Sequence, residues 1–219
     1  MCITQNAVVR FDAVLFDFGG VFLPSPFEVL YQAASEYGVP PETVLATCFG
    51  SYDQDTDHPW HRLERGEVTA EQALAGIAAL GKESGLDIDP IAVLASAMGS
   101  GNLVRDDVVQ AARDVKALGL KTAIVTNNIK EYGAKWRALL PLDEIFDVVV
   151  DSCEEGVRKP DRRIFELTLH RLGDIPPERA VFLDDAPGNV AAAAKLGLHA
   201  IRVAGDHLPA LTELRTVLG

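Results

Sequence analysis

The sequence predicts an α/β fold, a doubly wound parallel sheet into which an all-helical segment is inserted after the first strand. From residue 105 onward, short apolar runs alternate with helical stretches of about ten residues, which is typical of parallel strands joined by helices. Between residues 26 and 103, apolar residues recur at helical spacing, and no run has the pattern of a strand. We therefore expect an α/β core domain formed by residues 1–23 and 104–219 and a helical cap domain formed by residues 24–103.

The first expected strand consists of four consecutive apolar residues, Ala13–Phe16, and this pattern favours burial on both faces. Asp17 follows directly, and a carboxylate at the end of an apolar run is unfavourable unless a partner compensates its charge. Gly19 and Gly20 come next and allow the backbone to turn sharply and to approach a ligand closely. By itself, this pattern fits an ordinary turn with a solvated Asp17 equally well.

The helical insertion is expected to contain several short helices. Proline and glycine residues separate them, and Thr69 with Gln72 forms a capping box that opens one of them. The expected helices run from Phe27 to Ala34, from Pro41 through Cys48, from Thr69 to about Leu80, and from Pro90 to Met98.

The rest of the chain alternates between helix and strand. The expected helices run from Val108 to Leu118, up to Leu140, from Asp161 to Gly173, from Pro187 to Gly197, and onward from Leu208. Between them lie the expected strands Thr122–Val125, Phe146–Val150, Val181–Leu183 and His199–Val203.

Composition narrows the class of protein. The chain has 219 residues, of which 48% are hydrophobic, and its formal net charge is −12, which argues against a nucleic acid or an anionic membrane as partner. A phosphorylated substrate stays compatible, because a divalent cation reverses the charge locally. Three widely spaced cysteines indicate reduced thiols, and no signal peptide or membrane span is recognisable. We expect a cytoplasmic protein.

Three of the expected strands end in residues of the kind that bind ions or phosphate. In open parallel sheets, ligands bind in the crevice beyond the carboxyl ends of the strands, so these residues meet if the strands are neighbours. Lys159 lies in the loop after a fourth strand and can reach the same place. The residues at the three strand ends are Asp17, then Thr126 with Asn127, then Asp184 with Asp185.

These residue types suit phosphoryl transfer assisted by Mg²⁺. Asp17 and the adjacent Asp184 and Asp185 place more negative charge in a crevice than it tolerates without a cation, and carboxylates are ligands that Mg²⁺ prefers. A carboxylate can then attack phosphorus and form an aspartyl-phosphate. The Thr126 hydroxyl and nearby N–H groups can hold the phosphoryl oxygens, and Lys159 can neutralise charge on the transferred group.

With these four motifs in this order, the chain resembles the haloacid dehalogenase superfamily over nearly its whole length. It is most similar to the phosphatase branch with a helical cap after the first strand, as in sugar-phosphate phosphatases and the phosphatase domain of soluble epoxide hydrolase. The strings at 64–69, 157–161 and 181–189 also resemble the family. The resemblance implies a Rossmann-like core with strand order 5-4-1-2-3 and Mg²⁺ as cofactor.

The resemblance also implies a role for each site residue. Asp17 and Lys159 correspond to the catalytic residues, and Thr126 and Asn127 to the phosphate-binding residues. Asp17, Asp185 and the carbonyl of Gly19 correspond to the metal ligands. Asp184 and Asn189 correspond to residues that contact the metal ligands rather than the metal. From the sequence alone, Asp184 could equally cap the helix that starts at Pro187.

Gly19 departs from the family pattern. The family's phosphatases usually carry a second aspartate at this position, and it protonates the leaving group. Loss of a general acid typically costs about 10²–10⁴-fold in rate. Two alternatives therefore stay open, a metal-independent 2-haloacid dehalogenase and a non-catalytic binding protein on the same fold. The Asp184 and Asp185 pair argues against the dehalogenase, because uncompensated carboxylates repel both its anionic substrate and the halide.

The remaining expectations concern the cap and the partners. The substrate is expected to be a small phosphorylated molecule whose identity the sequence leaves open, and an exposed apolar face of the cap could support a homodimer. A polar cluster in the cap could contact substrate or supply the missing proton, but a solvated helix face explains it as well, so no site is assigned there. The cluster consists of His58, Trp60, His61, Arg62 and Arg65.

Overall fold

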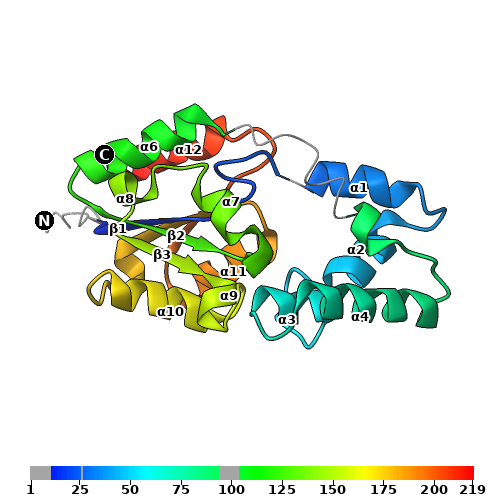
Figure 1. Ribbon diagram of the computed structural model, residues 1–219. Coiled ribbons are helices and arrows are strands. Elements are labelled where there is room, and N and C mark those ends of the chain that lie inside the picture. Colours follow the sequence, from blue (N-terminus) through cyan, green and yellow to red (C-terminus); the bar gives the residue numbers. More distant parts are fainter. Residues whose placement is uncertain (1–10, 26, 94–103) are drawn as a thin grey trace, which may run out of the picture.

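The computed structural model describes residues 11–25, 27–93 and 104–219. The core is one five-stranded parallel sheet in the order β3-β2-β1-β4-β5, which confirms the predicted α/β class and strand order. Figure 1 shows the sheet between two layers of helices, with a separate group of helices to one side. The strands are β1 (Ala13–Phe16), β2 (Lys121–Thr126), β3 (Val148–Asp151), β4 (Ala180–Asp184) and β5 (His199–Arg202).

Helices of the core cover both faces of the sheet (Figure 1). One face carries α6 (Asp106–Ala117), α7 (Gly133–Arg137), α8 (Leu142–Ile145) and α12 (Leu208–Leu218). The other face carries α10 (Arg162–Arg171) and α11 (Pro187–Leu196), and the short α9 (Ser152–Glu155) follows β3 directly. Two 3₁₀ turns, Lys130–Tyr132 and Pro177–Arg179, complete the connections.

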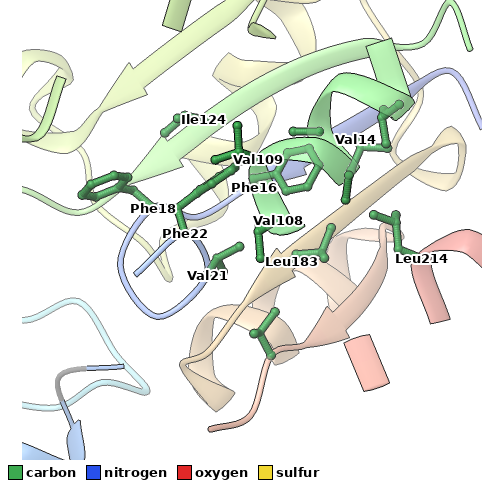
Figure 2. Close-up of a cluster of buried hydrophobic side chains, with 14 of the residues drawn as sticks. Val14, Phe16, Phe18, Val21, Phe22, Val108, Val109, Ile124, Leu183 and Leu214 are labelled. Carbon is green, nitrogen blue, oxygen red and sulfur yellow. The ribbon is translucent and has the colours of Figure 1, made fainter. Parts of the chain in front are cut away.

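The central strand β1 is fully buried because both of its faces are covered. Val14 and Phe16 point into the cluster formed with α6 and α12 (Figure 2), and Ala13 and Leu15 point into the cluster formed with α10 and α11. This alternation follows from the period of two in a strand. The four apolar residues that suggested a central strand therefore hold β1, and with it Asp17, in the middle of the sheet.

The helices between β1 and α6 form a cluster of their own. They are α1 (Phe27–Ser35), α2 (Pro41–Phe49), α3 (Pro59–Glu64) and α4 (Ala70–Glu83), and we call residues 27–93 the helical segment. Leu30, Val44, Phe49 and Ile77 are buried together between these helices. The predicted capping box is present, because the Thr69 side chain accepts from the backbone N–H of Gln72, and the Gln72 side chain accepts from that of Thr69.

Several predicted boundaries differ from the structure. The predicted helix up to Leu140 is split into the 3₁₀ turn at 130–132 and α7, and α3 was not predicted as a helix. Strand β3 begins two residues later than expected. The Asp147 backbone N–H still donates to the Thr122 carbonyl at 2.9 Å, but side chains bind the Thr122 N–H and the Ile145 carbonyl in place of further ladder bonds. The Asp147 carboxylate accepts from the Thr122 backbone N–H at 2.9 Å, and the Thr122 hydroxyl donates to the Ile145 carbonyl at 2.5 Å.

One further prediction falls partly outside the described residues. The helix predicted over Pro90–Met98 starts at Pro90 and is described as far as Val93, and its remainder lies outside the described residues. Within the described residues, no helix combines the length and the apolar character needed to cross a lipid bilayer.

Candidate active site

The carboxyl ends of β1, β2 and β4 bring the predicted polar residues together at one edge of the sheet. Phe16, the last residue of β1, pairs with Ile124 of β2 on one side and with Leu183 of β4 on the other. The Asp17 backbone N–H continues the ladder with a 2.8 Å hydrogen bond to the Leu183 carbonyl. One cavity of about 190 Å³ is lined from below by Asp17, Gly19, Thr126, Asn127, Lys159, Asp185, Ala186 and Asn189.

Lys159 lies between two of the carboxylates. Its Nζ is 2.8 Å from Asp17 Oδ1 and 2.6 Å from Asp184 Oδ2, and its side chain is only 1% exposed. Burial opposes the charged form of Lys159, but the neighbouring Asp17 and Asp184 carboxylates outweigh it and raise the pKa of the ammonium group. A permanent positive charge therefore lies within contact distance of the Asp17 carboxylate.

Asn127 positions Lys159 through its backbone. The Asn127 side chain donates from Nδ2 to the Lys159 carbonyl at 2.9 Å, and its Oδ1 accepts from the Lys159 N–H at 2.8 Å. Both polar ends of this amide are thus engaged with the loop before α10. The Asn127 side chain fixes Lys159, which leaves its backbone N–H as the group of Asn127 that can meet a phosphoryl oxygen. The sequence did not reveal this division of roles.

Asp184 is completely buried and surrounded by donors. Besides Lys159, it accepts from the Ala186 backbone N–H at 2.8 Å and from Asn189 Nδ2 at 3.1 and 3.0 Å. These bonds hold the Asp184 side chain against the start of α11. The helix-capping interpretation and the site interpretation of Asp184 are therefore compatible, since the same carboxylate binds both the turn before α11 and Lys159.

Three carboxylates form an acidic centre at the bottom of the cavity, which Asp17 and Asp185 line and behind which Asp184 is buried. Asp17, Asp184 and Asp185 each offer an oxygen, and these oxygens all lie within 4.8 Å of one another. Burial, followed by repulsion from Asp184, raises the pKa of Asp185 to about 6, although the Ser25 hydroxyl donates to Asp185 Oδ2 at 2.6 Å. Burial also raises the pKa of Asp17 well above its usual range, and Lys159 offsets only part of that effect.

This donor set fits a hard divalent cation. Three carboxylates and one ammonium group leave a net charge of about −2 in a buried cluster when all are ionised. Burial first, and repulsion between the carboxylates after it, raises the pKa of Asp17 and of Asp185, which marks an uncompensated negative charge in this cluster. A cation between Asp17 and Asp185 relieves it, and Mg²⁺ takes oxygen ligands of this kind. The residues present therefore match the metal that the sequence predicted.

The two glycines after Asp17 differ in what they permit. At Gly19, a Cβ atom would meet nothing within 4 Å, so the glycine leaves open space in the cavity where a side chain would fit. At Gly20, φ is +72° and a Cβ atom would lie 2.1 Å from Asp185 Cγ. The backbone of the β1 turn thus passes so close to Asp185 that only glycine fits there.

Arg105 holds the turn after β1 and was not predicted. Its Nη1 donates to the carbonyls of Gly20 and Val21 at 2.9 and 3.2 Å, and its Nη2 donates to the Gly205 carbonyl at 3.3 Å. One guanidinium group therefore ties the β1 turn to the loop after β5. No local motif marks this residue in the sequence, because its partners are backbone carbonyls about 85 and 100 positions away.

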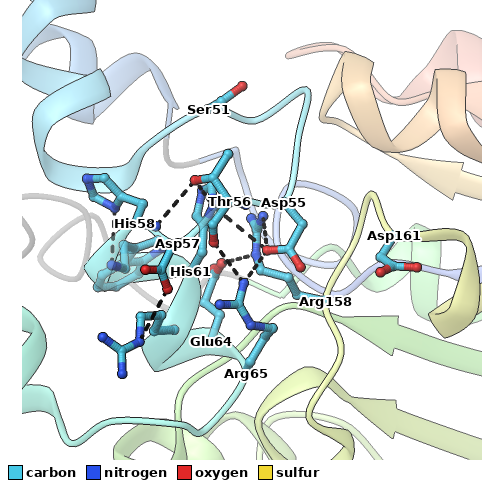
Figure 3. A network of polar contacts seen from close by, with 12 residues as sticks. Ser51, Asp55, Thr56, Asp57, His58, His61, Glu64, Arg65, Arg158 and Asp161 are labelled. Atoms are coloured by element: carbon cyan, nitrogen blue, oxygen red, sulfur yellow. Dashed lines mark hydrogen bonds and ion pairs between the residues drawn. The ribbon is translucent and has the colours of Figure 1, made fainter.

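A buried ion pair joins the helical segment to the core. Arg158, next to Lys159 in the chain, donates from Nε to Glu64 Oε2 at 2.7 Å, and Asp55 Oδ1 lies 3.6 Å from Arg158 Nη1. Figure 3 shows Arg158 between Asp55 and Glu64, with Arg65 beside them. Arg158 is 2% exposed and Glu64 is 7% exposed. The loop that carries Lys159 is therefore anchored to α3 as well as to Asn127.

Of the polar cluster predicted in the helical segment, Trp60 lines the cavity and His58, His61, Arg62 and Arg65 do not. His61 is completely buried, and burial followed by the nearby Arg158 charge lowers its pKa to about 3. The backbone N–H of Thr56 donates to His61 Nδ1 at 3.0 Å, so the ring binds the chain around it. Trp60 packs edge-on against Phe49, with ring centroids 5.1 Å apart, and is the member of the cluster that lines the cavity.

Comparison with known proteins identifies the family. The family model of haloacid dehalogenase-like hydrolases matches residues 11–197, which is most of the chain. The chain belongs to this family of hydrolases, as the order of its motifs predicted.

Individual relatives and solved structures agree with this placement. The chain is 38% identical to acyl-CoA dehydrogenase family member 10 of Mus musculus over 99% of its own length, and it spans only 20% of that protein. It is 26% identical to the sesquiterpene phosphatase astK of Aspergillus oryzae over 95% of this chain and 97% of that one. The structure of a predicted HAD-like family hydrolase from Porphyromonas gingivalis shares the fold, with a TM-score of 0.64 and 24% identity over 95% and 98% of the two chains.

Proposed function

We propose that this protein is a Mg²⁺-dependent phosphomonoester hydrolase that acts through an aspartyl-phosphate on Asp17. The observation that carries the proposal is the pairing of Asp17 with Lys159 at 2.8 Å, inside a cluster whose three carboxylates lie within 4.8 Å of one another. A nucleophile, a fixed positive charge and a place for a cation thus share one cavity. The similarity to a sesquiterpene phosphatase over nearly the full length of both chains supports hydrolysis of a phosphate ester.

Asp17, Asp185 and the Gly19 carbonyl would hold the metal, with Asp184 behind them. When bound, Mg²⁺ neutralises the negative charge of the carboxylates and of the phosphoryl oxygens, so that two anions can approach. The raised pKa of Asp17 makes this compensation necessary, because the attacking oxygen must be ionised.

The residues of the chain suit a two-step reaction. A carboxylate oxygen of Asp17 attacks phosphorus, the bond from phosphorus to the ester oxygen breaks, and the alcohol leaves. Water then attacks the aspartyl-phosphate, which releases inorganic phosphate and restores Asp17. Lys159 balances the charge that develops on the phosphoryl oxygens, and the Thr126 hydroxyl with nearby backbone N–H groups orients them.

Residue 19, where the family's phosphatases usually carry the aspartate that protonates the leaving group, cannot supply that proton in this protein. Gly19 has no side chain, and the space beside it is open. Water that enters this space can protonate the alkoxide, at a cost in rate of about 10²–10⁴-fold relative to a positioned acid. We therefore expect slow turnover of alkyl esters and faster turnover of esters with acidic leaving groups.

We further propose that residues 24–103 act as a cap that closes the cavity and selects the substrate. The helical segment contributes Leu30, Phe49, Tyr52, Trp60 and Glu64 to the cavity wall. Two backbone contacts seat it on the core. A Cβ atom at Gly66 would lie 2.3 Å from the Cys153 carbonyl oxygen, and one at Gly188 would lie 2.3 Å from the Tyr52 carbonyl oxygen.

The proposal is tested by phosphate release from p-nitrophenyl phosphate with and without Mg²⁺. We expect release that requires Mg²⁺ and that falls at least about 10³-fold in Asp17→Asn, because the variant lacks the nucleophile. Asp143→Asn removes an exposed carboxylate of α8 and serves as the matched control with wild-type activity. Equal rates in wild type and Asp17→Asn would refute the phosphatase mechanism.

The same assay separates the alternatives. A metal-independent dehalogenase would release chloride from 2-chloropropionate without Mg²⁺ and would leave p-nitrophenyl phosphate intact. The close cluster of Asp17, Asp184 and Asp185 disfavours that reaction, because it would repel the carboxylate of a haloacid in the absence of a cation. A binding protein without activity would release neither product.

A further inference from the structure

The cavity above the carboxylates has two walls of opposite character. We call the part lined by core residues the lower wall, and it carries the polar residues of the site. We call the part lined by residues of the helical segment the upper wall. Because Asp17, Lys159 and Asp185 hold the phosphoryl group below, the remainder of a substrate must face the upper wall. This step rests on the proposed phosphatase function. The chemistry of the upper wall then decides which alcohol the ester carries.

Hydrocarbon dominates the upper wall. Leu30 of α1, Phe49 at the end of α2 and Trp60 of α3 line it, and Leu30 and Phe49 are 3% and 4% exposed. The edge-on contact between Phe49 and Trp60 and the packing of both into the cluster of the helical segment hold these side chains in place. A substrate group that touches this wall meets a preformed apolar surface.

The charged group of the upper wall, the Glu64 carboxylate, is already engaged within the protein. Glu64 accepts from Arg158 Nε at 2.7 Å, and a hydrogen bond from the Trp60 side chain also lowers the pKa of its carboxyl group, which burial raises overall. Burial, followed by the Glu64 charge, raises the pKa of Tyr52, so its phenol stays neutral. Glu64 is thus committed to partners within the protein and is a poor acceptor for a substrate hydroxyl.

The described part of the helical segment offers the cavity no cation. Arg158, the basic residue nearest to the upper wall, is 2% exposed and bound to Glu64, and no lysine or arginine of the described residues 27–93 lines the cavity. A second phosphate or a carboxylate on the substrate would find no positive partner at this wall. The wall therefore favours a substrate whose only charged group is the phosphoryl group.

We propose that this site takes the phosphate monoester of a small apolar alcohol, and that the wall formed by Leu30, Phe49 and Trp60 selects it against polyol phosphates. Hydroxyl groups buried against this wall lose their water partners without gaining protein partners, whereas methyl or methylene groups gain contact. The volume of about 190 Å³ is below the roughly 300–1,000 Å³ of sites for drug-sized ligands, so the alcohol is small.

The test compares two esters of the same shape, 2-methylbutyl phosphate and glycerol 3-phosphate, in which methyl groups replace hydroxyl groups. With Mg²⁺ and wild-type protein, we expect kcat/KM to be at least about 10-fold higher for the apolar ester. An equal or reversed ranking, with phosphate release that Asp17→Asn abolishes, would overturn the apolar selection and leave the phosphatase function standing. If neither alkyl ester is hydrolysed, p-nitrophenyl phosphate still tests the phosphatase proposal, and calorimetric binding of the two alkyl esters to the Mg²⁺-loaded protein decides the selection, with equal or reversed affinities overturning it.

A pair of variants locates the selection on the upper wall. Trp60→Gln places an amide at this half-buried position, and we expect the ratio of kcat/KM between the two esters to fall several-fold. Ile77→Val removes one methylene group from the same apolar cluster without touching the cavity, so its ratio should equal that of wild type. If Trp60→Gln has the same ratio of kcat/KM between the two esters as wild type, the wall does not select the substrate. If Trp60→Gln does not fold, the comparison of the two esters with wild-type protein still decides the substrate class.

Discussion

Gly20 has a backbone conformation that favours glycine, and it also lies directly against the Asp185 carboxyl group of the acidic centre. Its φ of +72° is unfavourable for any residue with a Cβ atom, and a Cβ atom there would overlap the Asp185 carboxyl group at 2.1 Å. The turn after β1 and the turn after β4 therefore approach as closely as backbone and carboxylate can. Asp185, which follows β4, can therefore hold its position only because Gly20, in the turn after β1, has no side chain.

Replacing Gly20 by alanine should displace Asp185 and weaken metal binding. Gly38→Ala is a matched control, since Gly38 has a φ of +71° but a Cβ atom there meets nothing within 4 Å. Both variants should lose about 1–2 kcal/mol of stability from the backbone strain. Only Gly20→Ala should weaken Mg²⁺ binding, by about 10-fold or more, as measured by calorimetric titration. Equal Mg²⁺ affinity in the two variants would show that the contact with Asp185 is unimportant.

Some residue roles were accessible from the sequence and others were not. Asp17 and Asp185 directly follow or adjoin strand ends and Lys159 lies in the loop after β3, in a recognisable order along the chain, so their convergence could be predicted, whereas their chemical roles stay a proposal. Ser25 and Arg105 contact the site through a lone hydroxyl and through backbone carbonyls, and neither contact leaves a local pattern. Such residues are found only when the fold shows which distant segments meet.

At the scale of elements, α3 and the loop before α10 are joined by the ion pair of Glu64 and Arg158. Both side chains are nearly excluded from water, so each charge depends on the other for compensation. The pair forms across 94 positions in the chain. It makes the placement of Lys159 sensitive to the placement of the helical segment, because Arg158 and Lys159 are adjacent.

Removing the Glu64 carboxylate should therefore destabilise the protein more than removing an exposed one. In Glu64→Ala, the Arg158 charge stays buried with only Asp55 nearby, and we expect a loss of about 3 kcal/mol in the free energy of unfolding. Glu166→Ala breaks an exposed i,i+4 pair with Arg162 on α10 and should leave the stability nearly unchanged. Denaturant unfolding of both variants measures the difference, and similar losses would contradict the importance of burial.

Secondary structure was predictable where local signals are strong. The capping box at Thr69 and the prolines at the starts of α2 and α11 correctly marked where helices begin. The start of β3 was misplaced because Thr122 and Asp147 replace ladder bonds with side-chain bonds, a tertiary arrangement without a local signature. Helix α3 was missed because its six residues offer too short a window for helical periodicity.

For the whole molecule, groups with opposite pKa shifts act on stability in opposite directions as the pH changes. Asp17, Glu64 and Asp185 have raised pKa values, so the stability that they contribute is present at low pH and is lost as the pH rises through those values. His61 acts in the other direction. Its pKa is lowered from 6.5 in a free chain to about 3 in the folded protein, because the neutral ring is buried.

His61 should therefore make the protein sensitive to acid. Between pH 6.5 and about 3, the unfolded chain binds a proton at this residue that the folded chain does not, so stability falls as the pH falls, by up to about 1.4 kcal/mol per pH unit. His61→Gln removes the titrating group and can still accept a hydrogen bond from the Thr56 N–H. Measured by denaturant unfolding from pH 7 to pH 4, the variant should lose less stability than wild type. His170→Gln alters an exposed histidine and should follow wild type. If all three proteins lose stability in parallel, other groups cause the acid sensitivity, and the burial of a neutral His61 contributes nothing to it.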